Sequence, residues 1–286
     1  MDKVAIVTES VACLPKDLAK KYGVLVVPLP VIIGGQVYYD GVDITPGEVY
    51  ELQRKRKVLP TTSAASPSEI IQVYRTASEK ANAILHLSLS SKLSMAFDSA
   101  RQAKEMAKEA IPGVEIEVLD TRTAAGAQGF LVLAAAQVAA SGGSLTQAIQ
   151  AVEQLAPKVH IFITVDTLHF LAKGGRVPKA AAWAGSLLSI KPILQVAEGE
   201  ALPFERIRTK PKAIKRLLEI MEKRAGQKGV HVNLMHAGVP EEAEELKKQL
   251  LARFDCAELY VTEFTPVMGV HTGPGLVGLA FYSEES

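Results

Sequence analysis

Short apolar runs alternate with helical segments through the first half of the chain. Four runs with apolar residues on both faces are predicted to be buried strands. They are residues 4–7, 24–27, 83–87 and 114–119. Because helical segments separate them, the order predicts a mostly parallel sheet with helices on both faces, which is an α/β architecture.

Two of the intervening helices have explicit start signals. Thr45 and Ser66 each offer an N-cap hydroxyl, and each is followed by a proline at the first helical position. Glu48 and Glu69 then complete the two motifs in the manner of a capping box.

The order of elements changes after Pro157. A strand at 159–165 leads into a helix that runs toward Lys173 and stops at Gly174-Gly175, a pair suited to a left-handed C-cap. At 286 residues the chain exceeds the usual size of one domain. We therefore predict an α/β domain of residues 1–157 and an α+β domain of residues 158–286. The predicted elements of the second domain also include a hairpin at 196–201, helices at 211–224 and 240–254, and strands at 230–235, 259–264 and 276–281.

Composition and charge limit the class of protein. The chain is 48% hydrophobic and 22% charged, and its formal net charge is +1. It can therefore bury ordinary cores. Nucleic acid binding requires a strongly basic face, whereas these charges are mixed along the chain. We do not expect this protein to bind nucleic acid.

The amino terminus runs straight into a predicted strand, without the apolar core and cleavage site of a signal peptide. The longest apolar stretch, 130–140, is too short to span a bilayer. Cys13 and Cys256 are too few for a disulfide framework. We expect a cytoplasmic protein with no transmembrane segment, although transient contact with a membrane surface stays open.

Hydroxyl side chains follow several of the predicted strands. In open α/β sheets, ligands lie beyond the carboxyl ends of the strands. Hydroxyl donors there suit a small anion or a carboxylate, but serines and threonines also cap helices and satisfy loops, so the pattern alone leaves both uses open. The segments concerned are Thr8-Glu9-Ser10, Thr61-Thr62-Ser63, Ser88 to Ser91 with Ser94, and Asp120-Thr121.

Several enzyme signatures are missing from the sequence. It contains no Gly-x-Ser-x-Gly elbow, no Gly-Lys-Ser/Thr phosphate loop, no His-Glu-x-x-His and no paired cysteine spacing for a metal. Residues 273–278 fit Gly-x-Gly-x-x-Gly, but they lie near the carboxyl terminus and are predicted to lead into a strand rather than a helix. We therefore reject a dinucleotide site there.

Two basic residues are candidates for contact with an anion. His271 lies in the glycine-rich segment 269–273, which we predict to be a loop whose backbone can approach a ligand closely. A surface histidine among turn glycines is the competing interpretation. Arg176 follows the predicted C-cap and either complements the helix end or binds an anion or a partner carboxylate.

Taken in order, these segments resemble the DegV family of bacterial lipid-binding proteins nearly end to end. Thr8-Glu9-Ser10 is similar to the family's Thr-Asp-Ser opening. The segment 60–67 resembles its Thr-Ser-x-Pro-Ser loop, and 89–94 resembles its Ser-Ser-x-Leu-Ser segment. The second-domain motifs are matched by 171–177, 190–194 and 271–275.

The resemblance implies a two-domain protein that buries a long-chain fatty acid between its domains, with no cofactor and no metal. It also implies a non-catalytic binding subunit, which presents the acyl carboxylate to a separate fatty acid kinase subunit for phosphorylation. Carried onto this chain, the ligand-binding residues are Thr62, Ser63, Ser90, Ser91, Ser94 and His271, and Arg176 lies near the head group and the docking surface.

Three positions depart from the family pattern. Glu9 replaces the usual aspartate, and Ala65 replaces a proline. Met95 stands where glycine is usual, so it is expected to alter the loop or to fill the head-group site.

Two other functions stay open. In the first, the protein is an enzyme for acyl or phosphoryl transfer. His271 is the base, one of the serines that follow the predicted strands is the nucleophile, and Asp120 or Asp166 is the group that orients the histidine. In the second, the protein only binds other proteins and its pocket is filled by Met95.

Overall fold

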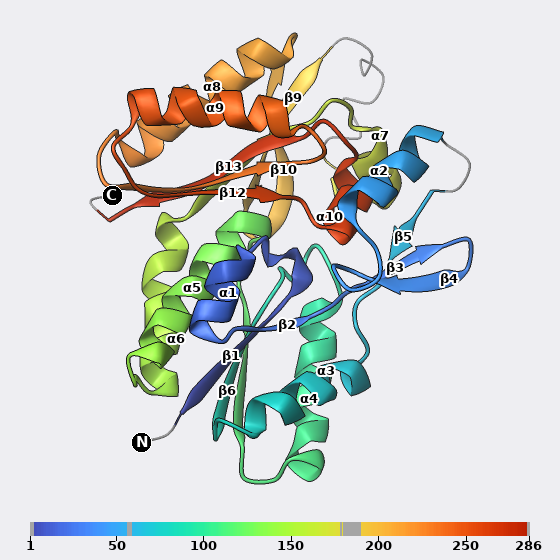
Figure 1. The fold of residues 1–286 in the computed structure, drawn as a ribbon, viewed down its shortest axis with the longest axis vertical. Coiled ribbons are helices and arrows are strands. Elements are labelled where there is room, and N and C mark those ends of the chain that lie inside the picture. Colours follow the sequence, from blue (N-terminus) through green and yellow to red (C-terminus); the bar gives the residue numbers. More distant parts are fainter. Residues whose placement is uncertain (1–2, 56–58, 178, 180–189, 285–286) are drawn as a thin grey trace.

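The computed structural model describes residues 3–55, 59–177, 179 and 190–284, and Figure 1 shows their arrangement. A four-stranded sheet in the first half has the order β2-β1-β6-β7, and all of its neighbouring strands are parallel. These are the four strands expected from the apolar runs, so the α/β prediction is confirmed. Their bounds are β1 (Val4–Glu9), β2 (Leu25–Val27), β6 (Ala83–Ser88) and β7 (Glu115–Asp120).

Helices cover both faces of this sheet because the buried side chains of each strand alternate between them. On β1, Ile6 packs toward the helices on one face and Val7 toward those on the other. The helices on the Ile6 face include α5 (Ala125–Ala140) and α6 (Leu145–Leu155). The helices on the Val7 face are α3 (Pro67–Ser78) and α4 (Ala96–Ala110). A shorter helix, α1 (Lys16–Tyr22), packs against α5.

The second half forms a six-stranded mixed sheet with the order β10-β9-β8-β13-β11-β12. Helices α8 (Lys210–Ala225) and α9 (Pro240–Arg253) pack on one face, and α5 lies against the other. Because α5 is covered by both sheets, most of its residues are buried, which explains its Ala-rich sequence. The strands are β8 (His160–Thr164), β9 (Lys191–Ala197), β10 (Glu200–Ile207), β11 (Val230–His236), β12 (Cys256–Glu263) and β13 (Val277–Ser283).

A small antiparallel sheet, with the order β4-β3-β5, was not predicted from the sequence. It consists of β3 (Pro30–Ile33), β4 (Gln36–Tyr39) and β5 (Thr61–Thr62), and helix α2 (Pro46–Lys55) lies between β4 and β5 along the chain. The signal that could have revealed it is Gly34-Gly35 between two apolar runs, since both glycines have positive φ, as a two-residue hairpin turn requires.

Two helices near the middle of the molecule bear on the site. Helix α7 (His169–Gly174) ends at Gly175 with φ of 70°, which confirms the predicted left-handed C-cap. The loop predicted at 269–273 is wrong, because most of it is the last turn of helix α10 (Pro266–Thr272). Thr265 and Pro266 provide an N-cap residue and a first-turn proline, so the start signal was present in the sequence.

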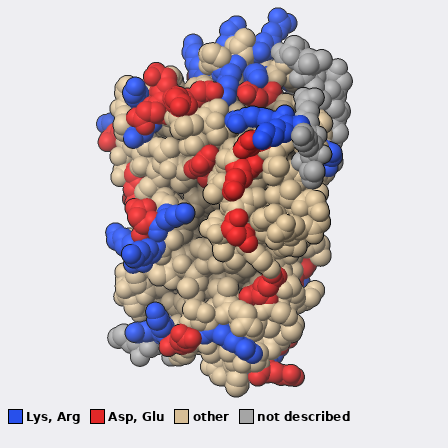
Figure 2. Space-filling view, turned by 45° about the vertical axis from the view of Figure 1, so that its right-hand side comes forward, with Lys and Arg blue, Asp and Glu red and all other residues tan. Residues whose placement is uncertain are grey.

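The strands of the four-stranded and small sheets all precede residue 157, and those of the six-stranded sheet all follow it. Within the described ranges, no helix is both long and apolar enough to cross a bilayer. On the face that Figure 2 shows, acidic and basic side chains are interspersed with uncharged surface.

Candidate functional site

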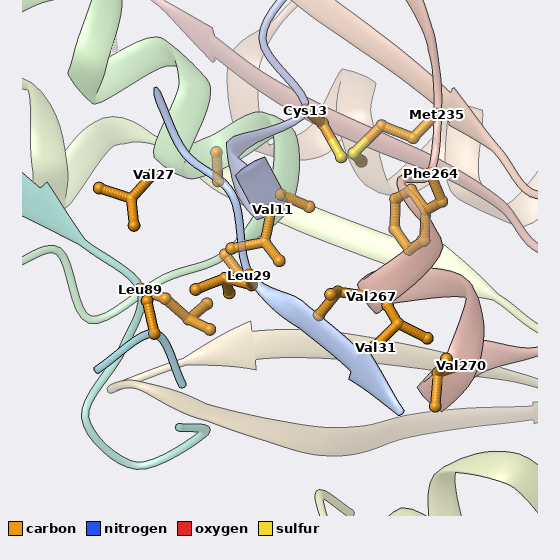
Figure 3. Close-up of a cluster of buried hydrophobic side chains, with 14 of the residues drawn as sticks. Val11, Cys13, Val27, Leu29, Val31, Leu89, Met235, Phe264, Val267 and Val270 are labelled. Atoms are coloured by element: carbon orange, nitrogen blue, oxygen red, sulfur yellow. The ribbon is translucent and has the colours of Figure 1, made fainter. Parts of the chain in front are cut away.

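An apolar cavity with a volume of about 100 Å³ lies where the small sheet, α10 and the two large sheets meet. Its walls come from segments far apart in the sequence, including Val11 after β1, Leu29 after β2 and Val267 on α10. Figure 3 shows these side chains in one buried cluster with Leu89 and Phe264. The polar residues of its lining are Thr62, Ser63, Ser94, Arg176, His271 and Thr272.

An outer cleft of about 510 Å³ adjoins the cavity. Thr62, Arg176 and His271 line both spaces, so they stand at the boundary between them. The cleft is also lined by Lys173 and Gln53. A ligand with an apolar tail and an anionic head could therefore place its tail in the cavity and its head beside basic groups.

The imidazole of His271 contacts the small sheet. Its Nε2 lies 2.7 Å from Thr62 Oγ1, while its Nδ1 is buried and has no hydrogen-bond partner among the described residues. Burial and the positive charge of Arg176 lower the pKa of His271 to about 4, so the ring is neutral at pH 7. Buried N–H groups are left unsatisfied less often than acceptors, which favours the tautomer whose Nε2–H donates to Thr62. The hydroxyl hydrogen of Thr62 is then free for a ligand.

Gly174 is the reason the ring can lie so close to α7. A Cβ at this position would be 2.7 Å from His271 Nδ1. Gly174 therefore does more than end a helix, because its backbone packs closely against the imidazole.

Arg176 is anchored by two backbone carbonyls. Its Nη1 donates to Gly174 O at 2.6 Å and its Nε donates to Leu93 O at 3.3 Å. The side chain thus joins the end of α7 to the loop after β6, and it lines both the cavity and the outer cleft. This position fits either of its predicted roles, contact with a head group or with a partner.

The structure separates the hydroxyls that were predicted to contact a ligand. Thr62, Ser63 and Ser94 line the cavity, as does His271. Ser90 and Ser91 are not part of that lining. The buried Ser90 donates its hydroxyl to Gly199 O at 2.7 Å, and the exposed Ser91 donates to Asp120 Oδ2 at 2.6 Å.

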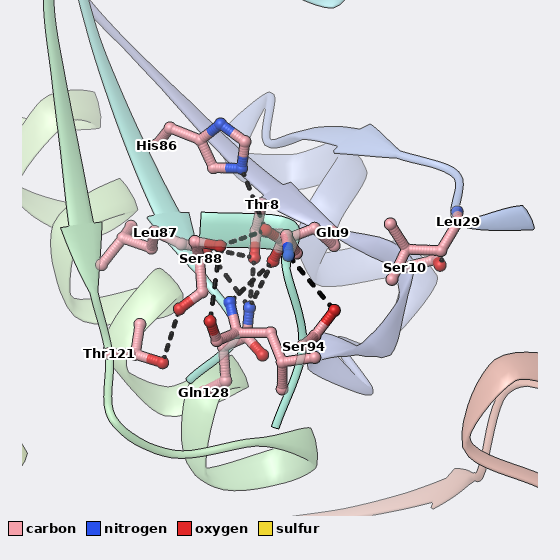
Figure 4. Close-up of polar contacts among 12 residues, drawn as sticks. Thr8, Glu9, Ser10, Leu29, His86, Leu87, Ser88, Ser94, Thr121 and Gln128 are labelled. Carbon is pink, nitrogen blue, oxygen red and sulfur yellow. Dashed lines mark hydrogen bonds and ion pairs between the residues drawn. The ribbon is translucent and has the colours of Figure 1, made fainter. Parts of the chain in front are cut away.

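Other hydroxyls at the strand ends join a buried network around Glu9, which Figure 4 shows. Glu9 accepts from Ser88 Oγ at 2.5 Å, from Leu89 N at 3.0 Å and from Gln128 Nε2 at 2.9 Å. Nε2 of His86 lies 3.3 Å from the same carboxylate. The network holds Leu89 at the cavity wall but places none of these carboxylate oxygens in the cavity lining.

The environment of Glu9 keeps it ionised. Burial alone would raise the pKa of this carboxyl, but the contact and charge of His86 and the hydrogen bonds from Ser88 and Leu89 outweigh it, so the pKa lies below its usual value. Thr8 and Thr121 add hydroxyl bonds to the carbonyls of Leu87 and Ser88. The hydroxyls at these positions hydrogen-bond neighbouring strand ends to each other. They therefore have the structural role that the sequence analysis gave as the alternative to ligand binding.

The three departures from the family pattern fall in different environments. Met95 is 64% exposed at the start of α4 and is not part of the cavity lining, so the expectation that it fills the head-group site is wrong. Glu9 belongs to the buried network. Ala65 is buried in the core next to the small sheet.

The carboxylates considered as partners for His271 are engaged elsewhere. Asp120 accepts from Ser91, and Asp166 pairs with Lys191 at 2.8 Å. Neither bonds to the imidazole, whose Nδ1 has no partner in the described part of the chain. The part of the chain that the structure describes contains no group of three or more His, Cys, Asp or Glu side chains that could hold a metal ion.

The chain is an α/β protein with an apolar cavity where its three sheets and α10 meet. A family model described as an uncharacterised protein of the DegV family matches residues 3–284. This chain belongs to the DegV family. A DegV domain-containing protein of Streptomyces coelicolor is 39% identical over 283 residues, covering 98% of this chain and 99% of that protein.

Solved structures agree with this assignment. A DegV family protein from Thermus thermophilus, described by its fatty acid binding, has a TM-score of 0.90 and 34% identity, covering 98% of this chain and 99% of the other. DegV from Bacillus subtilis, described as a fatty acid binding protein, has a TM-score of 0.89 and 31% identity, covering 99% of this chain and 100% of the other.

Proposed function

We propose that this chain binds a long-chain fatty acid, with the acyl tail in the apolar cavity and the carboxylate at Thr62 and His271. The observation that carries the proposal is the boundary formed by Thr62, Arg176 and His271, which separates an apolar space from a cleft lined by basic residues. The fatty acid binding described for the relatives from Thermus thermophilus and Bacillus subtilis supports the choice of ligand.

The tail supplies most of the binding free energy. Each buried methylene contributes about 0.8 kcal/mol, so a long acyl chain can bind tightly at a modest polar site. The cavity of about 100 Å³ is smaller than the roughly 300 Å³ at which ligand pockets usually begin. Side chains along the wall therefore move apart when the tail enters.

The head-group site binds the carboxylate mainly through neutral donors. The hydroxyl of Thr62 donates to one carboxylate oxygen, and the hydroxyls of Ser63 and Ser94 are further donors in the cavity lining. Arg176 supplies positive charge at the mouth without being buried in an ion pair, which avoids a large desolvation cost. No cofactor is needed for this role.

The exposed side of the carboxylate suits a role in presentation to another protein. We infer that a separate fatty acid kinase reaches the head group through the outer cleft and phosphorylates it, as the resemblance to binding subunits of that enzyme implies. Such a partner would be cytoplasmic, where ATP is available. Arg176 and Lys173 lie at the cleft and are the side chains that the kinase would meet.

Titration calorimetry of the lipid-stripped protein tests this function. Palmitate and hexadecanol have tails of the same length, but only palmitate carries a carboxylate. We expect palmitate to bind one per chain and more tightly than the alcohol. Equal affinities would remove the carboxylate from the proposed head-group site, and no binding of either would reject the lipid ligand.

A second candidate function is supported by the Thr62–His271 contact, because a hydroxyl bonded to an imidazole is also the start of a nucleophile–base pair. The unpartnered Nδ1 weighs against it, since no carboxylate among the described residues bonds to the ring. Incubation of the protein alone with acyl esters or ATP decides between the carrier function and the enzyme function. Turnover that His271→Ala abolishes would favour the enzyme.

A further inference from the structure

Helix α10 carries His271 to the head-group site, but most of the polar contacts that fix this helix come from residues early in the chain. It has only seven residues, and the side chain of its N-cap residue Thr265 makes no capping hydrogen bond to the backbone of the helix. Thr265 Oγ1 donates instead to Asp40 Oδ2 at 2.7 Å. A helix this short depends on such outside contacts, because its own backbone bonds are few.

Asp40 is buried and joins three segments. Its Oδ2 also accepts from Ser10 Oγ at 2.8 Å, and Ser10 Oγ accepts from Leu29 N at 3.2 Å. Asp40 follows β4 directly, so its position is set by the small sheet. The start of α10 is thereby attached to β4 and to the end of β1.

The other end of α10 is held by α2. Gln53 is 2% exposed, and its Nε2 donates to Gly269 O at 2.9 Å and Val270 O at 3.1 Å. Tyr50, one turn earlier, packs against the backbone between the two ends. A Cβ at Gly269 would lie 2.7 Å from the Tyr50 ring, so the helix and the ring are already in close contact.

The small sheet also carries the partner of His271. β3 pairs with β4, which precedes Asp40, and with β5, which contains Thr62. The small sheet therefore contains Thr62 and leads directly into Asp40, which contacts the start of α10. The distance between Thr62 and His271 depends on that common frame.

We propose that Asp40 and Gln53 are positioning residues for the head-group site, which hold the two ends of α10 so that His271 stays hydrogen-bonded to Thr62. The inference rests on the proposed function for its effect on ligand binding. Its structural part, the position of the imidazole, is independent of any ligand and can be measured without one.

The variant Thr265→Val tests this role, and Thr262→Val is its matched control. Both threonines donate a hydroxyl to a side-chain oxygen at 2.7 Å, Thr265 to Asp40 and Thr262 to Asn233. They lie three residues apart, but only Thr265 is at the start of α10. Gln53→Leu is the corresponding variant for the other end, and Asp40→Asn keeps an oxygen that can accept both hydroxyls.

The readouts are the ring nitrogen NMR shifts of His271 in the lipid-stripped protein, the melting temperature, and palmitate affinity. We expect Thr265→Val and Gln53→Leu to move the His271 shifts and to weaken palmitate binding about tenfold, the effect of losing one or two hydrogen bonds. Thr262→Val should lower the melting temperature to a similar extent, with the His271 shifts and the affinity unchanged. Asp40→Asn should retain the wild-type shifts.

Unchanged His271 shifts in folded Thr265→Val and Gln53→Leu proteins would overturn the proposal. So would an equal loss of affinity in Thr262→Val, because that would follow from stability alone. If the wild-type protein binds no palmitate, the proposed function fails, whereas the His271 shifts still decide whether Asp40 and Gln53 position the imidazole.

Discussion

Thr62 Oγ1 lies 2.7 Å from His271 Nε2, although the two residues are 209 positions apart in the sequence. Thr62 belongs to the small sheet and His271 to the last turn of α10. Their contact joins the two halves of the chain where the apolar cavity meets the outer cleft.

Substitution of Thr62 by valine keeps the shape of the side chain but removes its hydroxyl. Because that hydroxyl is the proposed donor to the carboxylate, we expect Thr62→Val to weaken palmitate binding about tenfold in titration calorimetry. Ser91→Ala is the control, since Ser91 donates to Asp120 and is not part of the cavity lining. Equal effects of the two substitutions would show that the head group does not lie at Thr62.

Gly174→Ala is expected to displace the imidazole of His271, because the added methyl group would lie 2.7 Å from Nδ1. Overpacking of this kind costs about 1–3 kcal/mol, so urea denaturation should show a clear loss of stability together with weaker palmitate binding. Gly47 is the matched helical position, since a Cβ there has open space. Gly47→Ala should leave both properties unchanged or slightly raise the stability. A Gly174→Ala protein with wild-type affinity would contradict the close packing at His271.

The lowered pKa of His271 makes stability depend on pH. The folded pKa is about 4, against an ordinary value of 6.5. Between these values the unfolded chain takes up a proton that the folded protein does not, so the free energy of unfolding falls as the pH falls. The contribution of His271 is a loss of about 2 kcal/mol between pH 7 and pH 5.

Urea unfolding of wild-type protein and His271→Gln at several pH values measures this contribution. Burial also lowers the pKa of His160 and His236, so both proteins should lose stability in acid. The difference between their slopes isolates His271, and the wild-type slope should be the steeper one. Parallel slopes would mean that the ring is protonated in the folded protein as readily as in the unfolded chain.

Ala201 lines the cavity from β10, so a larger side chain there should shorten the space for the tail. We expect Ala201→Leu to shift the preference toward shorter acyl chains, measured by competition between palmitate and laurate. Ala257→Leu is the control, because Ala257 is exposed on β12. An unchanged chain-length preference in Ala201→Leu would indicate that the tail follows a path away from β10.

Much of the fold could be predicted from the sequence because the relevant signals are local. The apolar runs identified the strands of the parallel sheet, and Gly175 ended α7 as expected. The small sheet was missed because its strands are only two to four residues long and β5 is separated from β3 by α2. The segment around His271 was wrongly predicted to be a loop, because its glycines were taken as a loop signal and the helix start signal at Thr265-Pro266 was given less weight.

The site was harder to predict because a hydroxyl's role depends on which groups face it in the folded protein. Ser90 and Ser94 belong to the same short segment, yet Ser90 bonds to Gly199 while Ser94 lines the cavity. Met95 follows directly and points to solvent. Asp40 carries no distinguishing local motif, and its contact with Thr265 spans 225 positions.

Native mass spectrometry of the gently purified protein, followed by solvent extraction, tests the central claim most directly. A chain that binds fatty acid in the cavity should retain one lipid, and the extract should contain a free fatty acid. Thr62→Val protein prepared in the same way should retain less of it. A wild-type protein that carries no lipid and takes up none when fatty acid is added would contradict the account.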